Sequence, residues 1–335
     1  MTNNKIGKKK EIRELWIAIA LLFSISLAIG DFHYHRIDKP HLEARLKLHR
    51  EIIDGSAKAP YRYRILVPFV MEGMLKILPQ SISTNKRFLL SYSAYNITVV
   101  FFMLILLFTY MRLWFTIQQS LVGILFVCST IVVAMKNHFY QPWSFLETAL
   151  FTFGLLAIFK KKYFLFAVLV VLATLNRATG LFLTLAYLLI SINMGVSQDN
   201  KGMPPLLNRQ DFLRFLVYFM LWLTIFFGLR WILGESGSVH TIKELWILNT
   251  NPVRLLHASI NIAMFLGLFW LFILLGFRCS PSYVRKTVRI VPFYILVIAI
   301  YGVWKEVRLL MVLYPIIVPL GLSFIYPKEK MAQVS

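Results

Sequence analysis

Residues 164–192 read FLFAVLVVLATLNRATGLFLTLAYLLISI, and the interpretation of this stretch decides the topology of the chain. It is either one long membrane helix or two short helices broken at Asn176–Gly180. Cytoplasmic loops of membrane proteins carry an excess of Lys and Arg. If the stretch forms two helices, the basic residues that follow it lie in the cytoplasm, and if it forms one helix, they lie outside. These residues are Lys201, Arg209, Arg214, Arg278, Arg285, Lys286, Arg289, Lys328 and Lys330. The charge pattern therefore favours the break.

The composition around this stretch is that of a membrane protein. Of the 335 residues, 58% are apolar and 15% are charged, whereas soluble domains are about half apolar and roughly a quarter charged. The formal charge is +21, but the basic residues stand in short segments between apolar runs. A nucleic-acid-binding domain would gather them into a patch on a polar surface. We therefore expect a lipid bilayer, and no nucleic acid, as the partner of the basic residues.

Ten apolar runs follow one another along the chain. A perpendicular span needs about 20 residues, and shorter helices are tolerated where protein surrounds them. The sequence thus predicts an all-α, polytopic transmembrane helix bundle of about ten spans, one domain over residues 1–335, with both termini cytoplasmic. The runs are Leu15–Gly30, Phe88–Met111, Leu121–Ala134, Trp143–Phe159, Phe164–Leu175, Leu181–Ile192, Phe212–Leu233, Leu256–Phe277, Val291–Trp304 and Leu309–Ile325.

The first run follows several lysines, which is typical of a retained anchor with a cytoplasmic N-terminus. The alternative is a signal peptide cleaved near Ala28–Gly30. Cys128 lies in the middle of a predicted helix and Cys279 at the end of one. We expect different depths for these two cysteines and hence no disulfide.

Residues 31–87 form the longest predicted outer loop. Within it, His41–Ile53 alternates Leu and Ile with His, Lys, Arg and Glu, and Tyr61–Leu78 is apolar with basic interruptions. Both patterns predict amphipathic helices that lie in the membrane interface.

Several cations on the outer side break the charge rule. A cation at such a position is costly without an anionic partner, and guanidinium groups match phosphate bidentately. We therefore predict a phosphate-binding role for Arg62, Arg64, Arg177 and Arg308. Tyr61 and Tyr63 would sit at headgroup level beside the first two, although an aromatic belt with snorkelling arginines is an equal alternative. For Arg177, with its neighbour Asn176, the alternative is a structural salt bridge to Glu147 or Glu306.

Asp31 directly follows the first predicted span. A carboxylate shielded by apolar walls there would act as a general base, and the alternative is a solvated helix end. Asp31, His33 and His35 alternate, so on an extended chain they would face one way and could hold a divalent metal. This is a weak pattern, and we predict no firm metal site or cofactor.

Polar residues before the fourth run add candidate substrate contacts, namely His138, Tyr140 and Gln141. Glu147 has the same candidate role, but Ser144 to Glu147 also fits a capping box at a helix start. Glu306 lies in the charged turn between Trp304 and Arg308. This turn carries three charged residues, Lys305, Glu306 and Arg308, and a turn that only connects two spans would not need them.

The layout and three short strings resemble GT-C-type glycosyltransferases, which use polyprenyl-phosphate-linked sugars. The matching features are Asp31 after the first span, the long loop 31–87, and the strings at residues 61–68, 176–179 and 306–310. The chain has no Asp-x-Asp or Asp-Glu pair after the first span. The resemblance implies an enzyme of the plasma or inner membrane that moves a sugar from a polyprenyl phosphate to a glycan, lipid or protein acceptor on the outer face, with inversion.

Two other functions fit the same sequence. One is a transporter or flippase for an anionic lipid or solute, because the Asn176–Gly180 break is typical of transporter helices. The other is a non-catalytic subunit of an envelope-polymer assembly. In that case, the outer charges need not converge on one site.

Overall fold

The computed structural model describes residues 2–137, 142–192 and 208–327, and this part of the chain is helical without a β-strand. Each of the ten apolar runs contains an α-helix. Five helices are long and apolar enough to cross a membrane, and a sixth span is possible if the pair α11 and α12, bent by 63°, counts as one. Three shorter apolar helices accompany them. The predicted helical membrane protein is therefore confirmed at this level.

The helices have the following bounds: α1 Thr2–His33, α2 Leu42–Ile53, α3 Leu66–Ile77, α4 Thr84–Met111, α5 Ile117–Ala134, α6 Ser144–Phe159, α7 Tyr163–Asn176, α8 Leu181–Ser191, α9 Arg209–Leu233, α10 Ile242–Thr250, α11 Pro252–Leu266, α12 Phe269–Gly276, α13 Ser282–Thr287, α14 Val291–Tyr301 and α15 Tyr314–Ile325. Short η segments join some of them, namely the π-helix η1 Tyr34–Asp38 and the 3-10 helices η2 Tyr61–Tyr63, η3 Met135–Asn137, η4 Ala178–Gly180, η5 Val288–Ile290 and η6 Val307–Leu313.

Local sequence explains where several of these helices begin. Thr116 and Gln119 form a capping box at the start of α5, and Thr241 and Glu244 form one at α10. Such boxes satisfy backbone N–H groups that the first helical turn leaves open. The capping box expected at Ser144 is absent: the N-cap of α6 is Trp143, which makes no side-chain cap bond. That expectation was wrong because Glu147 is bound by a distant segment instead.

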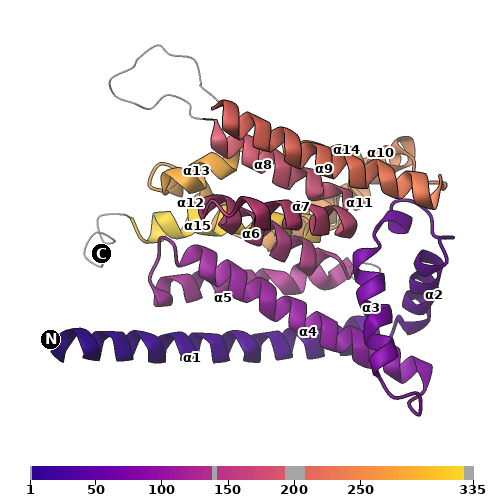
Figure 1. Ribbon diagram of the computed structural model, residues 1–335, viewed down its shortest axis with the longest axis horizontal. Helices are drawn as coiled ribbons and strands as arrows, with labels where there is room; N and C mark the ends of the chain where they lie inside the picture. The colour runs from indigo at the N-terminus through magenta and orange to yellow at the C-terminus, as the bar shows by residue number, and fades with distance from the viewer. Residues whose placement is uncertain (1, 138–141, 193–207, 328–335) are drawn as a thin grey trace.

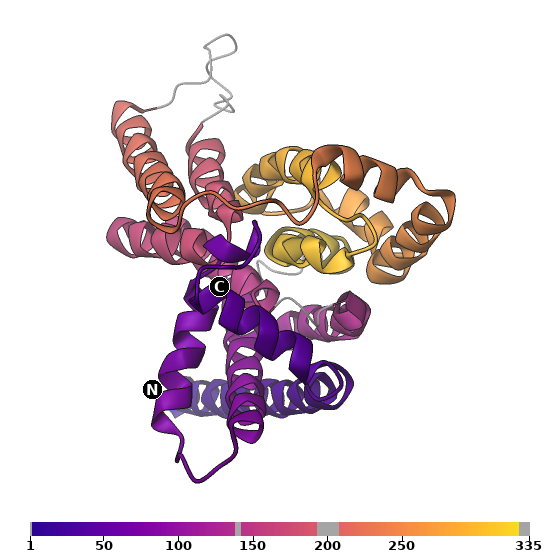
Figure 2. The same ribbon diagram turned by 90° about the vertical axis from the view of Figure 1, so that its right-hand side faces the viewer.

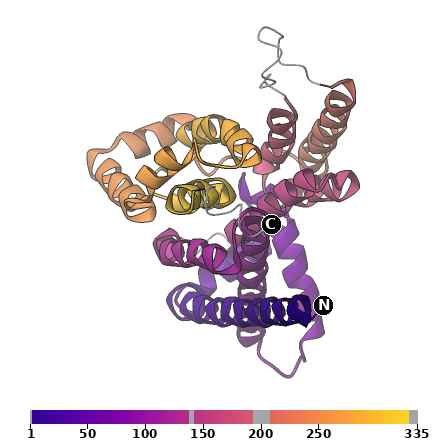
Figure 3. The same ribbon diagram turned by 90° about the vertical axis from the view of Figure 1, so that its left-hand side faces the viewer.

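The long helices run side by side along the longest axis of the molecule (Figure 1). α2 and α3 lie across one end of them, at the right of Figure 1. Seen along that axis, α11 to α15 form one group beside a second group that contains α1 and α4 (Figures 2 and 3). α6 packs against α4, α7, α8 and η6 and so connects these parts.

The sides of the bundle are apolar as well as its core. Trp16 on α1 is 67% exposed, and Trp231 on α9 is 90% exposed. Many exposed Leu, Ile and Phe side chains accompany them on α1, α9, α11 and α12. Soluble monomers rarely carry such large apolar surfaces, so contact with lipid is the physical reason for them.

The break in residues 164–192 is confirmed. α7 ends at Asn176, Arg177 is extended with φ −159° and ψ 147°, and α8 begins after η4. Gly180 lies so close to α7 that an added Cβ would be 2.8 Å from the backbone nitrogen of Thr174. Only a glycine leaves room for this tight reversal of the chain.

The connections between the helices place two charged parts of the chain at opposite ends of the bundle. α9 begins and α15 ends at the end far from α2, at the left of Figure 1. Since α7 and α8 form a hairpin, the basic segment Lys160–Lys162 lies at that same far end, and Arg177 lies at the end with α2 and α3. The helical segments expected in loop 31–87 are thus present, and they cover the end that holds the break.

Candidate functional site

Charged side chains are buried at the end of the bundle that α2 and α3 cover. We call one group of charged side chains at this end the arginine cluster and define it as Arg64, Glu147, Arg177, Glu306 and Arg308, of which Arg64 and Glu306 are partly exposed. Its members come from four places in the chain: the start of α3, the first turn of α6, the α7–η4 break, and the turn into η6. The packing of α6 on α7 and on η6 brings them together.

Glu147 and Arg177 form a buried ion pair. The guanidinium of Arg177 donates to Oε2 of Glu147, and the hydroxyl of Thr179 donates to Oε1 of the same carboxylate. Arg177 is 4% exposed and Glu147 is 7% exposed. The salt bridge to Glu147, which the sequence left open as an alternative, is therefore present. It also fixes the geometry of the break, because both partners of Glu147 lie within it.

Arg308 makes the second ion pair of the cluster. It donates to Oε2 of Glu306, two residues before it. The guanidinium is almost completely buried, whereas Glu306 is 20% exposed in its side chain. Nearby, the hydroxyl of Tyr294 donates to the carbonyl of Leu309 over 2.8 Å and ties α14 to η6. The charged turn is thus folded inward and is not a solvated connection.

Arg64 lies above two aromatic rings. Its guanidinium carbon is 5.2 Å from the centroid of Tyr61 and 5.2 Å from that of Trp143, and these rings stack on each other at 5.8 Å. The pKa of Arg64 is lowered to about 9, chiefly by burial and also by the positive charges of Arg177 and Arg308, while Tyr61 and Glu147 act in the opposite direction. The three arginines are therefore near enough to repel one another.

The arginine cluster carries more positive than negative charge. Three guanidinium groups face two carboxylates, which leaves a formal charge of +1. A net positive charge in a water-poor setting attracts anions. The cluster is thus suited to bind one further anionic group, and phosphate fits the guanidinium geometry.

A second buried group lies beside it, and of its members the sequence had singled out only His33. We call it the aspartate network: Asp38, His33, Arg45 and Asn96. His33 Nδ1 is 3.0 Å from Oδ2 of Asp38, Arg45 of α2 donates to Oδ1, and Asn96 of α4 donates to Oδ2 over 3.3 Å. All four side chains are at most 4% exposed. The sequence signal was a second acid, seven residues after Asp31 and seven before Arg45.

Asp31 does not have the shielded position expected of it. Its side chain is 75% exposed, and its carboxylate is 3.5 Å from Nε2 of His35, one turn further along the helix. The segment is helical and not extended, so His33 points into the core while Asp31 and His35 face outward. The geometry proposed for a metal at Asp31, His33 and His35 is therefore wrong. No group of three potential metal ligands occurs among the described residues.

Arg62 and Tyr63 hold a loop in place. Arg62 donates to the carbonyls of Leu233 and Glu235, and the hydroxyl of Tyr63 donates to that of Gly234 over 3.1 Å. These contacts fix the chain after α9, where Gly234 adopts a φ of +75°. Of the two arginines predicted to clamp a phosphate, the structure thus brings Arg64 into the cluster and commits Arg62 elsewhere.

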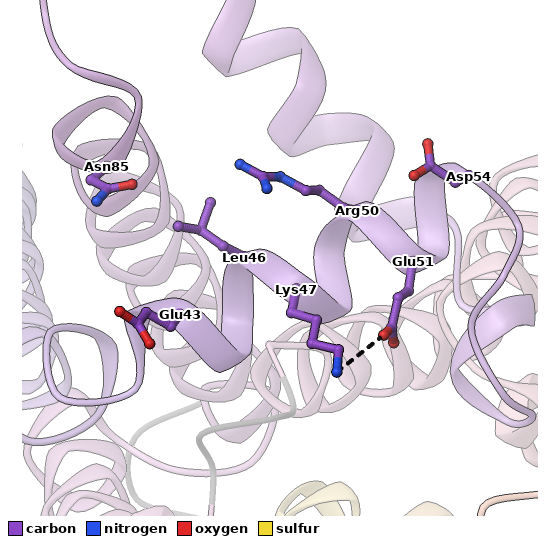
Figure 4. A pocket seen from close by; sticks show the side chains of 7 residues that line it. All are labelled: Glu43, Leu46, Lys47, Arg50, Glu51, Asp54 and Asn85. Carbon is purple, nitrogen blue, oxygen red and sulfur yellow. Dashed lines mark ion pairs between the residues drawn. The ribbon is translucent and has the colours of Figure 1, made fainter.

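Of the remaining candidate residues, one lies next to the arginine cluster and three lie outside the described part of the chain. Asn176 donates to the carbonyl of Trp143 over 3.2 Å, next to the cluster. His138, Tyr140 and Gln141 lie outside the described residues. A groove of about 400 Å³ runs along the outer face of α2, between charged residues such as Glu43, Lys47 and Arg50 (Figure 4). Its side chains point away from the buried groups, so we do not include it in the site.

No protein-family model matches the chain, and neither the curated proteins nor the solved structures include a match to it.

Proposed function

We propose that this chain is an integral membrane glycosyltransferase that binds the phosphate of a polyprenyl-phosphate-linked sugar in the arginine cluster. The observation that carries this proposal is the excess positive charge of Arg64, Arg177 and Arg308 at one end of an apolar bundle, where Arg177 and Arg308 are buried and Arg64 is partly buried. A lipid phosphate fits both features of this site, because its anionic head matches the arginines and its apolar tail matches the apolar helices.

In this reaction, the oxygen of an acceptor hydroxyl attacks the anomeric carbon of the sugar. The bond from that carbon to the phosphate oxygen breaks, and the phosphate leaves with the electron pair. Guanidinium groups that are already in position would stabilise the developing charge without reorganisation. The acceptor proton must pass to a base. Asp31 is poorly placed for this task, because its carboxylate is exposed on the side of α1.

The proposal includes the topology expected from the sequence. The ten apolar helical segments would form about ten spans, with the basic end in the cytoplasm and the arginine cluster facing outward at the plasma or inner membrane. α2 and α3 would then lie in the outer interface, over the entry to the cluster. α7 and α8 are shorter than a full membrane span, and this is acceptable because both pack against α6 and α9 and so are surrounded by protein.

A transporter or flippase is the second candidate, and one observation favours it. Among the described residues, α11 and α12 form an apolar pair bent by 63° at a short break, and such broken helices occur in many transporters. Liposomes separate the two functions. A flippase moves a labelled polyprenyl phosphate between leaflets without any acceptor, whereas a transferase releases polyprenyl phosphate from its sugar only when an acceptor is present.

Binding of undecaprenyl phosphate to the protein in nanodiscs tests the proposal. We expect Arg64→Gln to weaken binding at least tenfold, because a hydrogen bond to a charged group contributes about 1.5–3 kcal/mol. Arg254→Gln, an exposed arginine at the start of α11, is the matched control and should bind as the wild type does. Equal affinity of both variants, or no binding by the wild type, contradicts the proposal.

A further inference from the structure

A small cavity lies between the aspartate network and the arginine cluster. Arg45 and His49 of α2, Tyr92 of α4, Pro68 of α3 and the pair Pro142-Trp143 line it. The space open to the centre of a water molecule is about 10 Å³, which is close to the lower limit of roughly 10–15 Å³ for one ordered water. Trp143 also lies beneath Arg64, so the cavity and the arginine cluster share a wall.

Three of the lining residues carry a buried polar atom without a hydrogen-bond partner in the described part of the chain. These atoms are Nη2 of Arg45, Nδ1 of His49 and Nε1 of Trp143. The three side chains are 4%, 4% and 1% exposed. Buried polar atoms nearly always have a partner in protein or water. One oxygen in the cavity would satisfy them, because it can accept from the Arg and Trp N–H groups and donate to the imidazole.

The partner of Nε2 of His49 determines whether Nδ1, on the cavity side, can accept a hydrogen bond from this oxygen. Nε2 of His49 is 2.8 Å from Oε1 of Glu72 on α3. A carboxylate accepts hydrogen bonds and does not donate them, so Nε2 carries a proton, and in the neutral imidazole Nδ1 keeps its lone pair. A carboxylate that orients an imidazole in this way is the arrangement found in catalytic triads. The imidazole is also fixed by edge contacts with Phe88 and Tyr92.

We propose that the cavity binds one water molecule between Arg45, His49 and Trp143, and that Glu72 and His49 act through this water as the base of the transferase. This inference rests on the proposed function for the identity of the reaction. The acceptor hydroxyl gives its proton to the water, which releases its hydrogen bond from Nε1 of Trp143 to take it. The water then gives one of its own protons to Nδ1 of His49. Glu72 stabilises the resulting imidazolium, which returns the proton to solvent after product release.

A map of the wild-type protein that resolves ordered water tests the binding site without any activity. We expect density for one oxygen within hydrogen-bonding distance of Arg45 Nη2, His49 Nδ1 and Trp143 Nε1. Trp143→Phe removes one donor but keeps an aromatic ring, and the density should weaken or vanish in that variant. An empty wild-type cavity overturns the proposal, whatever the protein is found to catalyse.

Release of undecaprenyl phosphate from its hexose derivatives in liposomes tests the base. General-base catalysis contributes about 100-fold to 10,000-fold, so His49→Gln should lose at least 100-fold in kcat and keep its affinity for undecaprenyl phosphate. Glu72→Gln should show a smaller loss. Lys47→Gln, on the exposed face of the same helix (Figure 4), is the matched control.

The pH profile distinguishes a base from a structural residue. The charged and titratable groups that face His49 are Glu72 from α3, Arg45 from α2 and Tyr92 from α4, with Asp38 behind Arg45. The wild-type rate should fall at acidic pH as one group is protonated, and the residual rate of His49→Gln should lack that fall. An unchanged pH profile contradicts the base role. If the wild type releases no undecaprenyl phosphate, the proposed function fails, and the water map still decides the site.

Discussion

Asp31 and Asp38 are seven residues apart, yet their surroundings are opposite. Asp31 is exposed beside His35, and Asp38 is buried among His33, Arg45 and Asn96. The packing of α1 and η1 against α4 sets this difference. Asp38 is therefore the better candidate for a functional acid than Asp31, although it was not among the predicted site residues.

We therefore expect Asp31→Asn to retain at least about one third of the wild-type release of undecaprenyl phosphate. Substitutions at exposed positions away from a site usually change free energies by less than about 0.5 kcal/mol, which is a factor of two to three in rate. The measurement is the liposome assay described above. A loss of 100-fold or more would return Asp31 to the mechanism as a base.

Glu147 compensates Arg177 in the core, so Glu147→Gln should destabilise the protein strongly. Removing one partner of a buried ion pair costs about 3–5 kcal/mol, because the other charge stays behind without compensation. Unfolding in detergent, followed by temperature or denaturant, measures the loss. The double variant Glu147→Gln/Arg177→Gln should be less destabilised than the sum of the single variants. Glu43→Gln, exposed on α2, is the control. Additive losses would show that the pair is not coupled.

At the scale of elements, α12 packs closely against α15. A Cβ added to Gly276 would lie 1.9 Å from the carbonyl oxygen of Leu320. Small residues let membrane helices pack closely in this way, where dispersion forces and not water drive association. An added Cβ on Gly321 of α15 would likewise lie 2.2 Å from the ring of Phe269 on α12, so the α12–α15 contact depends on glycines of both helices.

Gly276→Ala should separate α12 from α15 and destabilise the protein by about 1–3 kcal/mol, the usual cost of overpacking. Gly228 of α9 has no atom within 4 Å of an added Cβ, so Gly228→Ala is the matched control. This control should be neutral or slightly stabilising, because Ala is the better helix former. The two variants are compared by thermal unfolding in the same detergent. Equal stability of both would show that the close approach is not required.

At the scale of the molecule, the two ends of the bundle should face opposite sides of the membrane. A background with Cys128→Ser and Cys279→Ser, the two free cysteines, allows single cysteines to be labelled from outside intact cells. Lys47→Cys on α2 and Glu235→Cys after α9 should react with an impermeant maleimide. Lys160→Cys should react only after the membrane is permeabilised. Labelling of Lys160→Cys from outside would reverse the orientation, and equal labelling of all three would contradict a spanning bundle.

Much of the helical architecture was predictable because its causes are local. Apolar runs must satisfy their backbone hydrogen bonds internally in lipid, and an α-helix does so within one segment. The break at Asn176–Gly180 followed from the charges after it, and the segments His41–Ile53 and Tyr61–Leu78 from their amphipathic patterns. Part of the site was predictable for the same reason, since Arg64, Arg177 and Arg308 interrupt apolar surroundings where a cation needs an anion.

The sequence by itself determined that the chain is a helical membrane protein, where its helices are interrupted, and which cations needed partners. Only the tertiary structure decided which partner each cation has: Glu147 for Arg177, Glu306 for Arg308, backbone carbonyls for Arg62. It also decided that Asp38 is buried and Asp31 exposed. Periodicity specifies which residues share a helix face, but the rotation of that face toward a neighbour is set by packing between segments far apart in the chain.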